Sequence, residues 1–174
     1  DFYIGAHFGG FRDRMRHVLL LDMAIHTFDQ SRFVTQTDPV AVLFAKEWNP
    51  IGSWYDHDAS AAAIFEMSNG VIFNYRGSWC AEGVNTEWEA DWRIVGTHGS
   101  LRWDGAERID IEVIDETAER GFRSKVKTVH LPTLDESSKT NGHRSLIEEF
   151  AACVRSGETP NTVASDNIKS LAMV

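Results

Sequence analysis

Residues 59–79 read Ala-Ser-Ala-Ala-Ala-Ile-Phe-Glu-Met-Ser-Asn-Gly-Val-Ile-Phe-Asn-Tyr-Arg-Gly-Ser-Trp, and this stretch decides the fold. Asn69-Gly70 lies between two runs of strand-forming residues. Both central positions of a two-residue hairpin turn favour positive φ angles, which asparagine and glycine tolerate. The stretch therefore predicts two antiparallel strands, residues 59–68 and 71–79.

Strand patterns continue on both sides of this hairpin. Residues 40–46 form a strand pattern that is apolar up to its last residue, Lys46. Residues 88–94 alternate between apolar and charged side chains, which is typical of a half-buried strand. Three more segments have strand character: residues 101–103, 109–113 and 122–131. The pattern predicts about six mostly antiparallel strands.

Helical patterns flank the strands. One helix is predicted from about His17 to Val34, a second over residues 144–155, and a third from Ser165 onward, with a polar loop at residues 135–141. This order predicts an α+β fold, in which an open, mostly antiparallel sheet of about six strands carries helices on one face. The helix that begins at His17 is apolar over most of its surface, so we expect it to be largely buried, Leu21 included.

The strand at residues 40–46 is apolar on both of its faces, since Val40, Val42 and Phe44 alternate with Ala41 and Leu43. Helices cover only one face of an open sheet. The other face needs a partner, which predicts a homodimer or homotetramer assembled through the open face of the sheet.

Composition limits the class of protein. The 174 residues are 43% apolar and 25% charged, as in an ordinary globular domain. No stretch approaches the roughly 20 apolar residues of a membrane span, and a formal net charge of −9 argues against a nucleic-acid partner. Two unrelated cysteines, Cys80 and Cys153, fit the reducing cytoplasm.

The ends of the chain suggest a fragment. It opens with Asp1 rather than methionine and closes on Ser170-Leu-Ala-Met-Val174, an apolar helical pattern without a C-cap signal. We expect residues 1–174 to be a single substrate-binding and oligomerisation domain cut from a longer protein.

Three ionisable residues interrupt the apolar helix. Asp22, His26 and Asp29 are spaced i, i+4 and i+7, which places them within an arc of roughly 60°. An imidazole flanked by carboxylates can give or take a proton near neutral pH. In a purely structural alternative, His26 is bonded to Asp29 and Asp22 caps a backbone group.

The loop before this helix offers further candidate residues. Arg12 and His7 lie in the glycine- and aromatic-rich loop that precedes it, where they are candidates for binding a polar substrate, whereas Arg14 is better explained as surface charge. A metal hydrolase that combines His26 and Asp22 with His7 or His17 is disfavoured because no HxH or HExxH spacing occurs.

Four segments resemble the Gfo/Idh/MocA family, the group of glucose–fructose oxidoreductase and inositol dehydrogenase. Leu21-Asp-Met-Ala-Ile-His-Thr-Phe-Asp29 resembles the signature D-x-x-x-H-x-x-D helix of the family's C-terminal domain. The other three are Trp92-Arg-Ile-Val-Gly-Thr-His-Gly-Ser-Leu101, Leu146-Ile-Glu-Glu-Phe150 with Gly157 and Pro160, and Asn167-Ile-Lys-Ser-Leu-Ala-Met-Val174. The resemblance spans nearly the whole chain in the family's order.

The resemblance implies a fold like the C-terminal domain of glyceraldehyde-3-phosphate dehydrogenase and an NAD(P)-dependent oxidoreductase acting on a sugar, inositol or related hydroxy compound. His26 would transfer the proton at the substrate hydroxyl or carbonyl, Asp22 would orient the substrate or the imidazole, and Asp29 would support them. NAD or NADP would be bound mainly by an N-terminal Rossmann domain, because this chain has no G-x-G-x-x-G. The isolated chain is then expected to be inactive. A non-catalytic oligomerisation or binding module of the same fold is the alternative.

Overall fold

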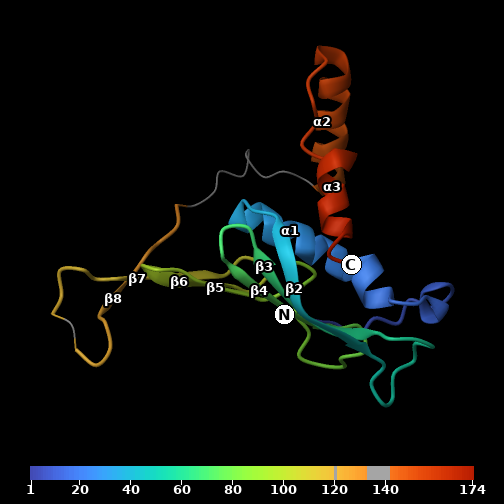
Figure 1. Cartoon of the computed structure of the whole chain (residues 1–174), viewed down its shortest axis with the longest axis horizontal. Coiled ribbons are helices and arrows are strands. Elements are labelled where there is room, and N and C mark those ends of the chain that lie inside the picture. The colour runs from blue at the N-terminus through green and yellow to red at the C-terminus, as the bar shows by residue number, and fades with distance from the viewer. Residues whose placement is uncertain (120, 133–141) are drawn as a thin grey trace. The chain divides into compact units, whose positions relative to one another are not determined.

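The computed structural model describes residues 1–119, 121–132 and 142–174. It is an α+β structure (Figure 1), as predicted. The chain forms two compact units, one of residues Asp1–Val129 with Lys169–Val174 and one of residues His130–Ile168. The polar loop expected at residues 135–141 lies outside the described residues.

The predicted hairpin forms the centre of the first sheet. Its strands are β3 (Ser60–Met67) and β4 (Ile72–Ser78), paired antiparallel. Gly70 has a positive φ of 80°, but Asn69 does not adopt a positive φ, and the amide of Met67 donates to the carbonyl of Val71. Residues 68–70 therefore form a three-residue loop instead of the expected two-residue turn. The edge strand β2 (Pro39–Trp48) pairs antiparallel with β3. A short β1 (Phe2–Tyr3) pairs parallel with β4, which gives the order β1-β4-β3-β2.

The remaining strands form a second sheet rather than extending the first. It has the order β5-β6-β7-β8, with β5 (Trp92–Val95), β6 (Gly99–Trp103), β7 (Ile109–Ile114) and β8 (Val126–Thr128). The expectation of one sheet was wrong because the chain turns before β5. Ala90 has a left-handed φ of 68°, and its amide donates to the carbonyl of Glu87, so the alternating residues before Trp92 form a turn and not a strand.

The helical region after the N-terminal loop has three parts. A single 3-10 turn, η1 (Arg12–Arg14), precedes a π-helical turn, η2 (Leu20–Ala24), which runs directly into α1 (Ile25–Thr35). The helix ends at Gln36, which adopts the left-handed conformation with a φ of 54°.

The first unit has its core between this helical region and the first sheet. The ring of Phe28 is fully buried and makes edge-on contacts with Phe65, Phe73 and Tyr75 of the hairpin. The expectation of a largely buried helix was wrong for its outer side, where Leu21 is 40% exposed and Phe33 is 75% exposed. Only the stripe that faces the hairpin is covered.

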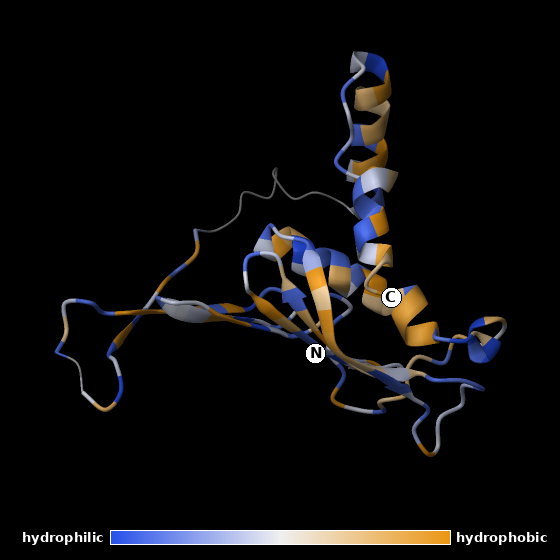
Figure 2. Ribbon diagram, in the orientation of Figure 1, coloured by the Kyte–Doolittle hydropathy of each residue, from blue (hydrophilic) through white to orange (hydrophobic). Residues whose placement is uncertain are grey.

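The edge strand β2 keeps much of its apolar surface. Orange residues follow it along most of its length (Figure 2), and exposed side chains occur on both of its faces. On the face away from α1, Phe44 lies opposite Ile64 of β3 and is 47% exposed.

The second unit is helical where it is described. It contains α2 (Gly142–Ser156) and most of α3 (Ala164–Leu171). Gly157 has a φ of 77°, and its amide donates to the carbonyl of Cys153, which ends α2. Within the described ranges, no helix has the length and apolar character needed to cross a lipid bilayer.

Candidate active site

The π-helical turn places Asp22 at the centre of an irregular segment. The amide of Ile25 donates to the carbonyl of Leu20, five residues earlier, instead of following the α-helical pattern. Such single π-turns inside helices are frequent at functional sites. No residue type in Leu20–Ala24 signals a π-turn, so sequence reasoning missed it.

Arg12 reaches Asp22 from the preceding loop. Its Nε donates to Oδ2 of Asp22 at 2.7 Å and its Nη2 to Oδ1 at 3.3 Å, which makes a two-bonded pair. The hydrogen bond to Asp22 raises the pKa of Arg12. The guanidinium carbon also lies 4.9 Å from the ring centres of both Phe8 and Phe11. The predicted substrate ligand Arg12 is therefore bound within its own chain.

His26 follows Asp22 after one turn and is exposed. Its imidazole makes no hydrogen bond or ion pair with any residue that the structure describes. The alternative of a bond between His26 and Asp29 is not what the structure shows. Of the three predicted residues on this helix, His26 alone presents a reactive group without a partner in the described ranges.

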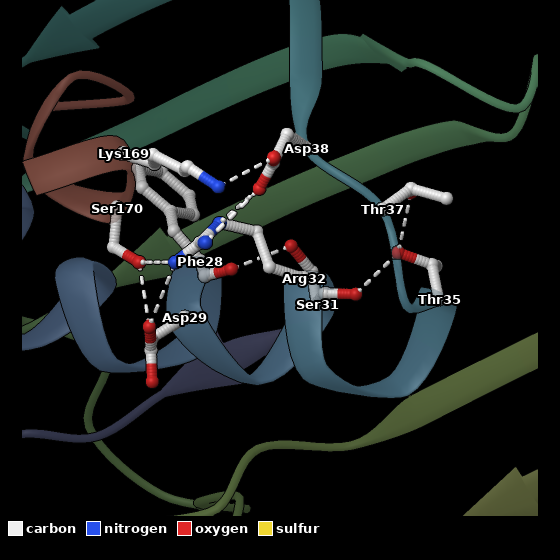
Figure 3. A network of polar contacts seen from close by, with 9 residues as sticks. All are labelled: Phe28, Asp29, Ser31, Arg32, Thr35, Thr37, Asp38, Lys169 and Ser170. Carbon is white, nitrogen blue, oxygen red and sulfur yellow. Dashed lines mark hydrogen bonds and ion pairs between the residues drawn. The ribbon is translucent and has the colours of Figure 1, made fainter. Parts of the chain in front are cut away.

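Asp29 belongs to a separate network of polar contacts (Figure 3). Its Oδ1 accepts hydrogen bonds from Ser170 at 2.6 Å and from Arg32 at 3.3 Å. Arg32 also donates to Oδ1 of Asp38 from Nε at 3.1 Å and from Nη2 at 3.0 Å, and Lys169 donates to Oδ2 of the same carboxylate at 2.8 Å. Asp29 thus ties α1 to the end of α3.

His7 lies against a pair of aromatic residues that sequence reasoning did not select. Its ring stacks on Trp54 at 3.6 Å between ring centres, and its Nε2 lies 2.7 Å from Oε1 of Glu82. Trp54 donates from its indole nitrogen to the carbonyl of Ala6 at 3.0 Å, and the hydroxyl of Tyr55 donates to the same carbonyl. Burial raises the pKa of Tyr55 to about 12. These bonds fix the loop that carries His7.

The predicted site residues therefore fall into three places. Arg12 and Asp22 form one pair, with His26 one turn further along the helix, while Asp29 and His7 each belong to a different cluster. Within the described ranges, no three histidine, cysteine or carboxylate side chains gather in a way that would hold a metal ion.

Comparison with known proteins places the chain in a family. Residues 10–102, more than half of the chain, match the model of the GFO/IDH/MocA C-terminal domain. The uncharacterized protein y4oX of Sinorhizobium fredii is 28% identical over 178 residues, which cover 100% of this chain and 48% of that protein.

Solved structures share the fold at low sequence identity. An oxidoreductase from Agrobacterium radiobacter in complex with NAD+, L-tartaric acid and magnesium matches with a TM-score of 0.74 at 18% identity, over 99% of this chain and 50% of its own. The UDP-N-acetylglucosamine 3-dehydrogenase of Acidithiobacillus ferrooxidans matches with a TM-score of 0.72 at 17% identity, over 99% and 50%. The aldose-aldose oxidoreductase of Caulobacter crescentus, complexed with glycerol, matches with a TM-score of 0.70 at 16% identity, over 98% and 48%.

The chain spans about half the length of these relatives. The family model covers the predicted signature helix, the hairpin and the first strands of the second sheet. The chain belongs to the GFO/IDH/MocA family, as a C-terminal domain of that type.

Proposed function

We propose that this chain is the substrate-side domain of an NAD(P)-dependent oxidoreductase that acts on a CH–OH group of a sugar, inositol or related hydroxy compound. Membership of the GFO/IDH/MocA family supports this proposal. Proteins with the same fold include one bound to NAD+, a sugar-nucleotide 3-dehydrogenase and one described as NADPH-dependent.

One observation carries the assignment of the site. His26 is exposed, has no partner among the described residues, and lies one helical turn after a carboxylate that Arg12 holds in place. A group that moves a proton must be accessible to the substrate, and one of its nitrogens must be free to form a hydrogen bond with it. Of the predicted residues on the helix, His26 meets both conditions.

The mechanism assigns a separate task to each side chain. In the oxidising direction, His26 accepts the proton of the substrate hydroxyl, and in the reducing direction it returns a proton to the carbonyl oxygen. Asp22, whose carboxylate is held by Arg12, orients the substrate or the imidazole. Asp29 supports the helix through Ser170 and Arg32. A nicotinamide cofactor, held by another domain, would supply the hydride chemistry at the substrate carbon.

Within residues 1–119, 121–132 and 142–174, no segment fits the phosphates of a dinucleotide. Gly9 and Gly10 have positive φ angles, but the helix after them, η1, has only three residues. That is too short to present the aligned amides of a phosphate-binding helix start. The proposal therefore includes a separate dinucleotide-binding domain, and the choice between NAD and NADP is made there.

Exchange of His26 tests the assignment in the full-length protein. We expect His26→Ala to lower turnover by about two to four orders of magnitude, because the proton must then move without a positioned base. Dinucleotide affinity, measured by fluorescence titration, should stay unchanged. His98→Ala is the matched control, since His98 is an exposed histidine in the second sheet's first turn. Full turnover in His26→Ala would refute the role.

A non-catalytic oligomerisation or binding module remains the second candidate. The observation that favours it is the exposed apolar surface of the first sheet, where Phe44 and Ile72 are 47% and 48% exposed. A full-length protein that assembles normally but binds no dinucleotide would support this candidate over the dehydrogenase.

A further inference from the structure

We infer that Arg12 is a positioning residue of the proposed site, which holds the carboxylate of Asp22 in place, and not a ligand of the substrate. The inference rests on the proposed function of His26. It replaces the role in substrate binding that the sequence predicts for Arg12.

The contacts that Arg12 makes within the chain occupy most of the guanidinium surface that a substrate would need. Two of its nitrogens bond both oxygens of Asp22, at 2.7 and 3.3 Å. The rings of Phe8 and Phe11 lie near the guanidinium carbon, each 4.9 Å away. A planar guanidinium that is already paired with a carboxylate and stacked on rings would have to break these contacts to bind a ligand.

The π-turn explains why Asp22 needs such a partner. An irregular backbone turn persists only where its surroundings stabilise it. Asp22 is the acidic residue of Leu20–Ala24, and Arg12 reaches it from a loop ten residues earlier. Both side chains are largely shielded, since 33% of Arg12 and 23% of Asp22 is exposed. A partly buried two-bonded pair of this kind can fix the turn in one conformation.

The pairing has a direct consequence for His26. Residues four apart on a helix are neighbours, so a free carboxylate at position 22 is within reach of an imidazole at position 26. In the structure the carboxylate is bonded to Arg12, and His26 makes no bond with any described residue. Loss of Arg12 would leave the carboxylate of Asp22 free to move, so its position relative to the imidazole and the substrate would no longer be fixed.

Kinetics of the full-length protein distinguish positioning from binding. We expect Arg12→Gln to lower kcat by about 10- to 100-fold while KM changes less than about threefold. Arg12→Lys should recover part of the loss, since it keeps the charge but not the two-bonded geometry. Arg12→Gln and Asp22→Asn should be non-additive when combined, because both remove the same interaction. Arg14→Gln, a change of an exposed arginine in the same loop, is the matched control.

A second readout does not depend on turnover. In Arg12→Gln, the amides of residues 21–25 should exchange hydrogen faster than in the natural protein and in Arg14→Gln, because the π-turn has lost its tether. If Arg12→Gln fails to fold, Arg12→Lys and Asp22→Asn are compared in the same two measurements.

Two results would overturn the inference. The first is a rise in KM with an unchanged kcat in Arg12→Gln, which would show that Arg12 binds the substrate. The second is an Arg12→Gln protein whose kcat, KM and amide exchange rates equal those of Arg14→Gln. Neither result bears on His26, whereas full activity in His26→Ala refutes the proposed function and leaves the exchange result for Arg12 intact.

Discussion

Arg32 shows how a charge is kept inside this protein. Its side chain is only 7% exposed, and it donates to the carboxylates of Asp29 and Asp38. Its Nη1 also donates to the hydroxyl oxygen of Ser170 at 2.7 Å (Figure 3). A buried guanidinium is tolerated only when its donors are satisfied in this way. The same bonds join α1, the start of β2 and the end of α3.

Acid should weaken this junction through Asp38. The hydrogen bond from Lys169, and then that from Arg32, lowers the pKa of the Asp38 carboxyl. A carboxylate whose pKa is lower in the folded state stabilises that state above its unfolded pKa, near 4. This contribution is lost as the pH falls through the lower, folded value.

We therefore expect the unfolding temperature of the full-length protein to fall as the pH is lowered below about 4. Asp38→Asn should lower that temperature at neutral pH and reduce its dependence on acid. Glu107→Gln, an exposed side chain without a partner in the described ranges, should change neither. Equal acid dependence in Asp38→Asn and the natural protein would contradict the role of Asp38.

At the scale of elements, the sequence predicted those features that depend on residues close together in the chain. Asn69-Gly70 predicted the β3–β4 hairpin correctly, although the loop is one residue longer than expected, because the signal lies within a few neighbouring residues. The parallel pairing of β1 with β4 joins residues about 75 positions apart, and no short pattern encodes it. For the same reason, the sequence placed Asp29 on the signature helix but could not reveal Ser170 beside it, 141 positions later.

The candidate site was predictable to the same degree. The spacing of Asp22 and His26 is visible in the sequence, whereas the partner of Asp22 is not, because an arginine-rich loop offers Arg12, Arg14 and Arg16 as equal candidates. In the structure Arg12 is the partner of Asp22, and the rings of Phe8 and Phe11 flank its guanidinium.

The packing of α1 on the β3–β4 hairpin can be tested by comparing a buried and an exposed phenylalanine of that helix. Phe28 is fully buried against the rings of Phe65, Phe73 and Tyr75, so Phe28→Ala should cost about 3–5 kcal/mol through the cavity it leaves. Phe33→Ala, at a 75% exposed position of the same helix, should stay within about 0.5 kcal/mol. Denaturant unfolding of the full-length protein measures both, and equal effects would show that the ring of Phe28 does not organise this core.

At the scale of the whole molecule, the first sheet has two unequal faces. One face carries Ala61, Ala63 and Phe65, which are almost completely buried beneath the helical region. The other face carries Phe44 and Ile72, which are about half exposed. Half-exposed large apolar side chains on an open sheet are typical of a surface that another chain covers.

The prediction of a homodimer or homotetramer through this face is tested by placing a charge on it. Phe44→Lys should convert the oligomer to smaller species, because assembly would bury an unpaired ammonium group at a cost of several kcal/mol. Sedimentation velocity of the full-length protein measures the change. Ile51→Lys is the matched control, an apolar-to-lysine exchange at a fully exposed turn between β2 and β3. An oligomer that persists in Phe44→Lys, with the same sedimentation coefficient as in Ile51→Lys, would locate the interface on another surface, since a buried lysine at position 44 could not be accommodated without a measurable loss of affinity.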